Sequence, residues 1–504
     1  MDLEKGAGAL PGRIYFVGIK GTGMCALAEL MHNQGVTVSG SDRDEVFYTD
    51  KILKDLGIPY YESFDASHIP AGKDAPELLI HSAAYSFETN PEMAEARSRG
   101  IPVQKYTDAL GAYSALFDSS AVAGVHGKTT TAALIGTILR GTGAPAQVLV
   151  GSAVSAFGDR STITIGNKYF VAETCEYKRH FLSFCPRRII ITSIESDHQD
   201  YYPAYEDIFA AFMEFGCKLP VGGELIYCAD DPGASQAALA LKAEKPDIQL
   251  VPYGFSAQGA FGIEKYEVKD ERIVMRLKDF PDEIKLRVPG RHTALNSAAA
   301  MALTSSIIRK EYGGKDNDGW NKERREGAVR ALEEFRGSRR RSEILGEVGG
   351  ILFMDDYGHH PTAIKTTLAG LKEFYPKRRL VLSFMSHTYT RTAALLDDFA
   401  GSFEMADILL LHRIYSSARE QYNGGVTGRT LYEKVKERRG GAVGSAFGGA
   451  GSLFYEEAPN SAVELMKSIL KKGDLFITMG AGDNWTLGKK LFEYYNEPNK
   501  RGSV

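Results

Sequence analysis

The sequence predicts an α/β protein of three domains, each built on a mostly parallel sheet. With 504 residues the chain is too long for a single hydrophobic core, and domains of ordinary size would make about three of it. Three successive blocks each alternate short apolar strands with helix-like segments, which is the pattern of parallel α/β units. We therefore expect domains over residues 1–114, 115–335 and 336–504.

The composition is ordinary for a soluble globular protein, with 43% apolar and 25% charged residues. A formal net charge of −4 offers no basic field to nucleic acid or anionic lipid, and no apolar run approaches the ~20 residues of a membrane helix. Five cysteines form no C-x-x-C pair, and the first residues lack the apolar segment of a secretory signal. We expect a cytoplasmic protein that neither binds nucleic acid nor inserts into a membrane.

The first block begins with a strand, a glycine turn, a helix and a second strand over Arg13–Asp42. The turn runs Gly18-Ile-Lys20-Gly21-Thr-Gly23, so Lys20 takes the place of the second glycine of the dinucleotide fingerprint G-x-G-x-x-G. Asp42 ends the second strand, where NAD-binding domains place an acid for the ribose. The block therefore predicts a Rossmann-like nucleotide-binding domain, although Lys20 counts against a standard NAD site. Further strands are expected at 78–84 and 101–104.

The second block opens with a phosphate-binding loop, AVAGVHGKTTT at 121–131. Glycines let backbone N–H groups turn toward phosphate oxygens, and the N-terminus of the following helix adds its dipole. Lys128 can reach the β- and γ-phosphates, and the Thr129 hydroxyl suits Mg²⁺. The usual loop is G-x-x-x-x-G-K-[ST], whereas here the nearest glycine, Gly124, stands only three residues before Gly127. A chance glycine turn is the alternative, but strand, loop and helix occur in register.

Two polar side chains follow further strands of this block. Strands are expected over Lys168–Glu173, Arg187–His198 and Gly223–Asp231. Because ligands of parallel sheets bind at the carboxyl ends of the strands, Glu173 and His198 would lie beside the phosphate loop. Glu173 offers the oxygen ligand that Mg²⁺ prefers. An ordinary loop carboxylate and a structural histidine are the alternatives.

The third block carries two polar clusters, each after an apolar strand. DDYGHHP occupies 355–361 and SHTYTR occupies 386–391. Polar groups at two strand ends are the expected rim of a binding site, and structural caps explain one such cluster better than two. Further strands are expected at 380–387, 407–412 and 474–483. The polar stretch Lys310–Gly327 and the glycine-rich stretch Glu437–Ser452 are expected to be surface insertions.

Together these motifs resemble the Mur ligases of peptidoglycan synthesis and, within that family, the branch that adds alanine. The family's shortened loop, G-T-x-G-K-T-T, is matched by GVHGKTTT at 124–131. Its D-D-Y-G-H-H-P-T signature is intact at 355–362, and its H-x-Y-T-R-T run stands at 387–392. GRHTALN at 290–296 and the paired arginines Arg340 and Arg341 also follow the family order.

The resemblance implies a Rossmann-like N-terminal domain for a UDP-linked substrate, a central P-loop ATPase-type domain with a mostly parallel sheet, and a Rossmann-like C-terminal domain for an amino acid. It implies ligation of L-alanine to UDP-N-acetylmuramate through an acyl phosphate, with ATP and Mg²⁺, by a monomer or weak homodimer. Lys128, Glu173 and His198 would be catalytic, and Mg²⁺ would bind Thr129, Glu173 and His198.

The resemblance also implies which residues contact each substrate. ATP would contact Gly124, His126, Gly127, Lys128, Thr129, Thr130, Asn296, Arg341 and Asp356. The UDP-linked substrate would contact Gly21, Gly23, Ser41, Asp42, Ser82 and His126. The amino acid would face Tyr357, His359, His387 and Arg391.

The sequence departs from the family pattern at several positions. Lys20 replaces a glycine of the first loop, Val125 replaces the loop threonine, and Thr293 replaces the asparagine of G-R-H-N. The acidic run E-A-D-E-S reads Glu173-Thr-Cys-Glu-Tyr here. The stretch AAFMEF at 210–215 lacks the lysine that related ligases carbamylate, as the alanine-adding branch does. These changes affect substrate detail more than reaction type.

Other interpretations stay open at this stage. A related ligase would add another amino acid or a recycled peptide, or would build folylpolyglutamate or cyanophycin. An NAD-dependent oxidoreductase would use the first block, which Lys20 disfavours. A nucleotide-binding regulator without turnover is disfavoured by the joint presence of Lys128, Glu173 and His198.

Overall fold

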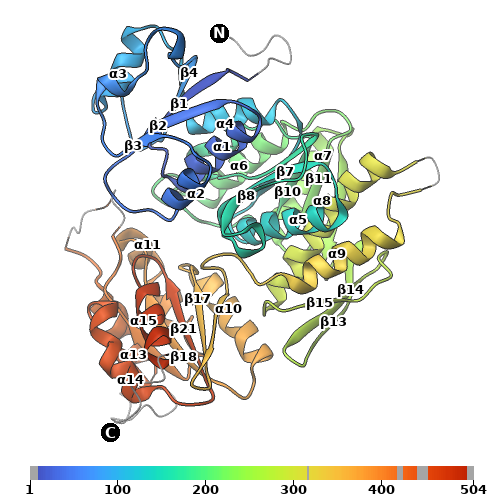
Figure 1. Cartoon of the computed structure of the whole chain (residues 1–504). Coiled ribbons are helices and arrows are strands. Elements are labelled where there is room, and N and C mark those ends of the chain that lie inside the picture. Colours follow the sequence, from blue (N-terminus) through green and yellow to red (C-terminus); the bar gives the residue numbers. More distant parts are fainter. Residues whose placement is uncertain (1–9, 315–316, 417–419, 421–423, 440–451, 497–504) are drawn as a thin grey trace. The chain divides into compact units, whose positions relative to one another are not determined.

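The computed structural model describes residues 10–314, 317–416, 420, 424–439 and 452–496 (Figure 1). The chain divides into two compact units. The first takes in the chain as far as Glu264, with Arg276–Asp282 and Leu295–Leu332. The second takes in Lys265–Met275, Glu283–Ala294 and the chain from Glu333 onward. None of the described helices is both long and apolar enough to cross a membrane.

The N-terminal part of the first unit is a parallel five-stranded sheet in the order β3-β2-β1-β4-β5. Its strands are β1 (Arg13–Val17), β2 (Thr37–Ser41), β3 (Tyr60–Tyr61), β4 (Leu78–His81) and β5 (Val103–Lys105). Its helices are α1 (Thr22–Asn33), α2 (Thr49–Asp55), α3 (Pro91–Ser98) and α4 (Tyr106–Ser114), with short 3₁₀ turns at Ala66–His68 and Gly72–Asp74. The runs predicted as strands in this block all form strands; β1 and β4 at the centre of the sheet are buried, whereas β5 at its edge is partly exposed.

The central part of the first unit is a sheet in the order β12-β11-β10-β6-β9-β7-β8. All neighbours are parallel except β8, which runs antiparallel to β7. The strands are β6 (Asp118–Ala123), β7 (Ala146–Val154), β8 (Arg160–Thr164), β9 (Tyr169–Glu173), β10 (Arg188–Ile191), β11 (Glu224–Cys228) and β12 (Gln249–Gly254). The helices are α5 (Lys128–Thr142), α6 (Tyr205–Gly216) and α7 (Pro232–Glu244), with 3₁₀ segments at Ser155–Phe157 and Tyr177–Ser183.

Five further elements lie between β12 and the last sheet. They are β13 (Phe261–Lys269), β14 (Arg272–Leu277), β15 (Ile284–Leu286), α8 (Arg291–Tyr312) and α9 (Lys322–Glu334). The interpretation of Lys310–Gly327 as a surface insertion is wrong at both ends, since these residues finish α8 and begin α9. Trp320 between the two helices packs its ring against Phe280 at 5.5 Å between centroids. Most of the other proposed insertion, residues 440–451, lies outside the described residues.

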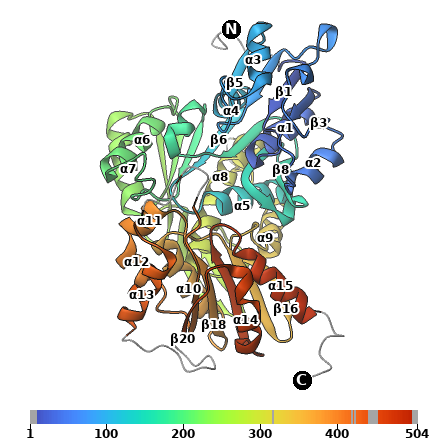
Figure 2. The same cartoon turned by 90° about the vertical axis from the view of Figure 1, so that its left-hand side faces the viewer.

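The second unit is built on a six-stranded sheet in the order β16-β17-β21-β18-β19-β20, with only β16 antiparallel. Helices α14 and α15 belong to this unit (Figure 2), and their apolar side chains pack in one cluster with those of the sheet. The strands are β16 (Glu343–Val348), β17 (Ile351–Asp356), β18 (Arg379–Met385), β19 (Ile408–Leu411), β20 (Ser452–Tyr455) and β21 (Asp474–Gly480). The helices are α10 (Pro361–Phe374), α11 (Tyr389–Ala394), α12 (Leu396–Ala400), α13 (Gly428–Arg438), α14 (Val463–Ile469) and α15 (Trp485–Asn496), with a 3₁₀ turn at Pro459–Ala462.

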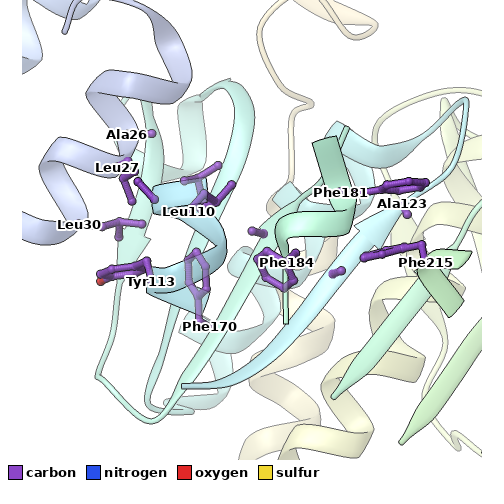
Figure 3. Packing of buried hydrophobic residues seen from close by; sticks show 14 of the residues in the cluster. Ala26, Leu27, Leu30, Leu110, Tyr113, Ala123, Phe170, Phe181, Phe184 and Phe215 are labelled. Atoms are coloured by element: carbon purple, nitrogen blue, oxygen red, sulfur yellow. The ribbon is translucent and has the colours of Figure 1, made fainter. Parts of the chain in front are cut away.

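One apolar core joins the two sheets of the first unit. Leu27 and Leu30 of α1 face Tyr113 of α4 and Phe170 of β9 (Figure 3). Two polar contacts reinforce this packing: Arg160 of β8 forms an ion pair with Glu29, and the Tyr48 hydroxyl lies 3.1 Å from Ser161 Oγ. The glycine turn after β1 and the phosphate loop after β6 therefore belong to one packed body.

Candidate active site

The phosphate loop joins β6 to α5 and is as tight as its shortened spacing suggests. Gly124 and Gly127 have φ values of 132° and 81°, in the range that favours glycine. Neither position has room for a side chain: a Cβ at Gly124 would lie 2.0 Å from Thr192 Oγ1, and one at Gly127 would lie 2.6 Å from Asn296 Oδ1. Asn296 of α8, expected to contact ATP, thus lies against the loop.

Lys128, the first residue of α5, turns its ammonium back over the loop. Nζ donates to the carbonyls of Gly124 at 2.5 Å and Val125 at 3.2 Å, and lies 2.9 Å from Glu176 Oε2. Burial opposes its charge, but the Glu176 carboxylate raises the pKa of Lys128 above the ordinary value. Burial likewise opposes the carboxylate, yet Lys128 holds the pKa of Glu176 below its ordinary value. The pair is therefore charged at neutral pH.

Glu173, the last residue of β9, lies next to the threonine that follows Lys128. The Thr129 hydroxyl donates to Glu173 Oε1 at 2.9 Å, and the Gly151 N–H donates to Oε2 at 2.6 Å. Thr129 is buried, and Thr130 beside it is half-buried. A hydroxyl and a carboxylate in contact at a phosphate loop form an oxygen donor set of the kind that Mg²⁺ binds.

His198 lies in the loop after β10 rather than at a strand end. The prediction of a strand reaching His198 is wrong, because β10 ends at Ile191 and the next residues bond to the loops around them. The Thr192 hydroxyl donates to the His126 carbonyl at 2.5 Å, and the Ile194 N–H donates to Asp231 Oδ1 at 3.1 Å. His198 still reaches the site, with Nε2 3.4 Å from Glu176 Oε1.

His126, inside the phosphate loop, is held from two sides. Its N–H donates to Ser193 Oγ at 3.0 Å, and its Nε2 lies 2.5 Å from Glu195 Oε1. Both partners belong to the segment that follows β10. The imidazole therefore lies at the rim of the loop, between the phosphate-binding turn and the segment that carries His198.

The glycine turn of the first sheet is organised around Asp42 and Lys20. The Asp42 carboxylate accepts the Lys20 N–H at 2.7 Å, the Arg43 N–H at 2.8 Å and the Tyr85 hydroxyl at 3.2 Å. Gly21 caps α1 without a side chain, and Gly23 follows in the first turn of that helix. The expected contacts Gly21, Gly23 and Asp42 thus lie at the carboxyl edge of the sheet.

The two expected serine contacts are placed differently. Ser82 follows β4 and is half-buried, and its Oγ accepts the Ala84 N–H at 3.3 Å. Ser41 is fully buried, and its hydroxyl donates to Glu92 Oε2 at 2.5 Å. The Ser41 side chain therefore faces the interior, and its carbonyl accepts the N–H groups of Gly18 and Ile19 at 2.8 and 3.1 Å, so Ser41 holds the glycine turn in place.

The four residues expected to face the amino acid lie together in the second unit. Ring centroids are 4.8 Å apart for Tyr357 and His359, and 5.2 Å apart for His359 and His387. Arg391 Nη1 lies 3.4 Å from His387 Nδ1. Two loops more than twenty residues apart in sequence thus converge, since they follow the β-strands β17 and β18 of one sheet.

Asp356 and Arg341 lie next to this cluster. Asp356 is buried, and its two oxygens accept the N–H groups of Ser342 and Gly358, each at 2.6 Å. The guanidinium of Arg341 lies 5.3 Å from the Tyr357 ring centroid, and that of Arg340 lies 5.1 Å from it. A basic, aromatic surface therefore adjoins the amino-acid cluster within this unit.

Family descriptions match most of the chain in three consecutive parts. "Mur ligase family, catalytic domain" matches residues 13–118, "Mur ligase middle domain" matches 122–304, and "Mur ligase, glutamate ligase domain" matches 340–482. The chain belongs to the Mur ligase family.

Individual relatives agree with this assignment over nearly the full length. The UDP-N-acetylmuramate–L-alanine ligase of Treponema pallidum (strain Nichols) is 50% identical over 487 residues, covering 96% of this chain and 97% of the relative. The corresponding ligase of Borreliella afzelii (strain PKo) is 36% identical and covers 94% of this chain and 97% of the relative. The crystal structure of the UDP-N-acetylmuramate–alanine ligase of Thermotoga maritima superposes with a TM-score of 0.72 at 25% identity, covering 96% of this chain and 99% of that one. The predicted α/β fold with three domains is confirmed.

Glu176 had no predicted role, yet it lies after β9 and beside the phosphate loop. Its carboxylate contacts both Lys128 and His198 while its side chain is only 3% exposed. The sequence feature that could have indicated a role for Glu176 is its position three residues after Glu173, in the altered acidic run.

Glu420 was also missed, and no local motif could have shown it. Its carboxylate accepts the N–H groups of Tyr389 and Thr390 at 2.6 and 2.9 Å and the Thr390 hydroxyl at 2.7 Å. The H-x-Y-T-R-T run is therefore held by an acid about thirty residues further along the chain.

Proposed function

We propose that this protein joins L-alanine to the lactoyl carboxylate of UDP-N-acetylmuramate, with conversion of ATP to ADP and phosphate. The observation that carries the proposal is the near full-length match to ligases of that name, combined with a complete set of charged groups at the phosphate loop. The reaction supplies the first amino acid of a peptidoglycan precursor. The use of ATP and a nucleotide sugar fits a reaction in the cytoplasm. We propose that the protein acts as a monomer or a weak homodimer.

In the first step a carboxylate oxygen attacks the γ-phosphorus and ADP leaves, which gives an acyl phosphate. The difficulty is electrostatic, because an anion must approach an anion, so positioning and charge neutralisation provide most of the catalysis. Lys128 supplies a fixed cation at the loop, held by Glu176 at 2.9 Å until a phosphate oxygen competes for it. The backbone N–H groups of the loop and the N-terminus of α5 bind the remaining phosphate oxygens.

The residues at the loop fit a magnesium ion. Thr129 and Glu173 would hold it, since their oxygens are already 2.9 Å apart at the end of β9, and His198 would help hold a second ion. Mg²⁺ supplies positive charge that neutralises the phosphate oxygens. Lys128 is the protein's own cation at the phosphate loop. Neutralisation of the phosphate oxygens would therefore be shared between the Lys128 side chain and the metal ion.

In the second step the amine of alanine attacks the acyl carbon and phosphate leaves, while the amine loses a proton. The cluster of Tyr357, His359, His387 and Arg391 binds the amino acid, with Arg391 facing its carboxylate in the bidentate geometry that a guanidinium favours. Arg341 and Asp356 contribute to ATP binding from the same unit.

The first sheet holds the UDP part of the substrate. Gly23 presents its backbone N–H in the first turn of α1, Gly21 caps that helix while its own N–H donates to the Gly18 carbonyl at 3.3 Å, and Asp42 and Ser82 lie at neighbouring strand ends. Ser41 would support this site indirectly, because its hydroxyl is engaged by Glu92 and its carbonyl accepts the N–H groups of Gly18 and Ile19 at 2.8 and 3.1 Å. His126, in the phosphate loop, would contact the UDP-linked substrate and lie near the γ-phosphate of ATP.

The test is phosphate release from ATP in the presence of UDP-N-acetylmuramate. Alanine, glycine, serine and a recycled cell-wall peptide are each supplied in turn as the second substrate. Release that requires both UDP-N-acetylmuramate and alanine supports the proposal. Equal release with all amino acids, or release only with the peptide, would replace it with a related ligase. Binding of NADH without phosphate release would replace it with an oxidoreductase.

A further inference from the structure

His198 has a backbone conformation that is unusual for a histidine. Its φ of 55° lies in the left-handed region, which residues other than glycine seldom adopt. Its carbonyl accepts the N–H groups of Tyr201 and Tyr202, both at 2.8 Å, and its own N–H donates to Asp197 Oδ1 at 2.7 Å. A strained residue of this kind persists only where its surroundings hold it, and such residues gather at functional sites.

The ring of Tyr177 packs against the imidazole of His198. The two ring centroids are 4.8 Å apart, and the ring planes meet at 42°. Tyr177 directly follows Glu176, whose Oε1 lies 3.4 Å from His198 Nε2. Two consecutive residues of the segment after β9 therefore contact the imidazole, one at Nε2 and the other on the ring.

Two tyrosine hydroxyls join this segment to the loop that carries His198. The Tyr177 hydroxyl donates to Asp200 Oδ2 at 2.7 Å, and the Tyr202 hydroxyl donates to the Glu176 carbonyl at 2.6 Å. The two bonds run in opposite directions, since Tyr177 follows β9 and Tyr202 follows β10. The buried Tyr202 bond holds the backbone of the loop, and the Tyr177 bond holds the ring that packs against the imidazole.

A histidine that binds a metal ion through one ring nitrogen needs a fixed ring plane, which neighbouring groups supply. In the proposed function, His198 helps to hold the second magnesium ion, and its Nε2 contacts Glu176, the partner of Lys128 at the phosphate loop. The family pattern E-A-D-E-S has a serine where this chain has Tyr177. A serine side chain is too short both to cover the imidazole and to reach Asp200.

We infer that Tyr177 is a positioning residue that fixes the plane of the His198 imidazole, so that Nε2 can bind the second magnesium ion. This inference rests on the proposed function for that ion and for the reaction that uses it. Tyr177 contacts no substrate in this account. It acts through His198, because its ring packs on the imidazole while its hydroxyl is anchored on Asp200.

The test is Tyr177→Ser, which introduces the residue of the family pattern and removes both the ring and its anchor. Mn²⁺ is titrated into the full chain with UDP-N-acetylmuramate and a non-hydrolysable ATP analogue, and bound ions are measured by electron paramagnetic resonance. The second ion should bind on the order of tenfold more weakly, as when other groups that orient a metal-binding histidine are lost. The first ion, proposed at Thr129 and Glu173, should bind as in the wild type. Phosphate release at limiting Mg²⁺ should fall, and raised Mg²⁺ should restore it in part.

Two further variants separate the ring from its anchor. Tyr177→Phe and Asp200→Ala each break the hydroxyl bond and keep the ring, so each should weaken the second ion less than Tyr177→Ser does. The double variant should be no worse than either single variant, because both remove the same bond. Tyr201→Ser is the matched control, since Tyr201 is 38% exposed in the same loop and its ring packs against Tyr202. It should leave the binding of both ions unchanged.

Wild-type binding of the second ion by Tyr177→Ser would overturn the inference. Equal weakening of both ions with a lower melting temperature would also overturn it, because Tyr177 would then only stabilise the fold of the loop. A wild-type protein that bound a single Mn²⁺ ion would do the same. If the wild type bound two ions but released no phosphate with any amino acid, the proposed function would fail, while the Mn²⁺ titration would still decide the role of Tyr177.

Discussion

Two lysines in two glycine loops of the first unit show how their partners decide what a buried cation can do. Lys20 is 1% exposed, and its Nζ contacts Asp50 at 3.1 Å, Glu62 at 3.0 Å and the carbonyls of Arg43 and Glu45. Lys128 is 15% exposed and has one carboxylate, Glu176, besides the carbonyls of its own loop.

The difference lies in the direction of the partners. Every partner of Lys20 beyond its own turn lies on the segment after β2, so the ammonium ties that segment to the glycine turn and has no capacity left for a ligand. The partners of Lys128 are two carbonyls of its own phosphate loop and one carboxylate, so its ammonium is held at the loop itself. We therefore interpret Lys20 as a structural cation beside the proposed UDP site and Lys128 as the cation of the proposed phosphate site.

The largest expected effect is that of Lys128→Met. Removing a charge that stabilises the transferred phosphate should lower phosphate release on the order of a hundredfold or more, because such contacts act in a site shielded from water. Melting temperature should fall as well, because Glu176, whose side chain is only 3% exposed, loses its cation. Near-normal release from the variant would remove Lys128 from the reaction and erase the contrast with Lys20.

Lys20→Met should lower stability as well but should largely spare turnover. It leaves Asp50 and Glu62 without their cation, and breaking a buried ion pair by removing one partner typically costs about 3 kcal/mol or more. A large fall in melting temperature and a raised KM for UDP-N-acetylmuramate are expected, with turnover at saturating substrate largely retained. Lys51→Met is the control, since Lys51 is 86% exposed and forms only a surface pair with Asp55. Full stability combined with lost turnover would show that Lys20 acts in the reaction itself.

The same contrast recurs between two arginines of the second unit. Arg340 is fixed by Asp355 at 3.0 Å and by the carbonyls of Gly480 and Gly482. Arg391 contacts His387 in the proposed amino-acid cluster. Arg391→Ala should raise the KM for alanine on the order of tenfold, with a smaller change in the KM for ATP, because the proposed partner is a carboxylate.

Arg340→Ala should instead lower the melting temperature, since it leaves buried Asp355 without its cation. Steady-state kinetics with each substrate varied separately would distinguish the two arginines. Equal changes in both KM values for Arg391→Ala would mean that this residue supports the loop rather than the amino acid.

The comparison also shows where prediction from sequence succeeded. The strands β1, β6, β9, β17 and β18 could be recognised because buried parallel strands are continuous apolar runs, and residues that follow them must meet at one edge. That rule placed Glu173 beside Lys128 and brought Tyr357 near His387. Partners such as Glu62 for Lys20 or Glu420 for Thr390 depend on how loops fold over the sheet edge, which no local pattern encodes.

The segment after β10 shows the limit most clearly. An apolar run followed by polar residues suggested one strand up to His198, but the polar residues bond to neighbouring loops, and the strand stops at Ile191. His198 reached the site for a different reason, through Glu176. The sequence marked Lys20 as a departure from the glycine pattern of the first turn, while its ion pairs depend on acids about thirty and forty residues away.

The smallest net effect on the wild type is expected from two buried groups of the second unit, because their pH dependences oppose each other. His412 is buried beside Ser383, with Nε2 2.8 Å from its Oγ, and burial lowers the pKa of His412 to about 4. Burial raises the pKa of Asp355 to about 6, in spite of Arg340. An unfolded chain would titrate the two groups near pH ~6.5 and ~3.9 respectively.

The signs follow from which state takes up the proton first. As pH falls from about 6.5 to 4, the unfolded chain protonates His412 before the folded protein does, so the stability contributed by neutral His412 is lost. As pH falls from about 6 to 4, the folded protein protonates Asp355 first, so stability is gained. Each effect amounts to about 3 kcal/mol, and in the wild type they largely cancel.

Single variants should therefore show the two opposing pH effects on stability, which cancel in the wild type. His412→Gln removes the loss, so its melting temperature should rise relative to wild type between pH 6.5 and pH 4.5. Asp355→Asn removes the gain, so its melting temperature should fall over the same interval. The double variant should follow the wild-type profile, because both terms are absent. Parallel profiles for all four proteins would mean that neither group is held away from its ordinary pKa. Burial alone would then not decide whether a side chain is neutral, as proposed for His412, or charged, as for Lys20.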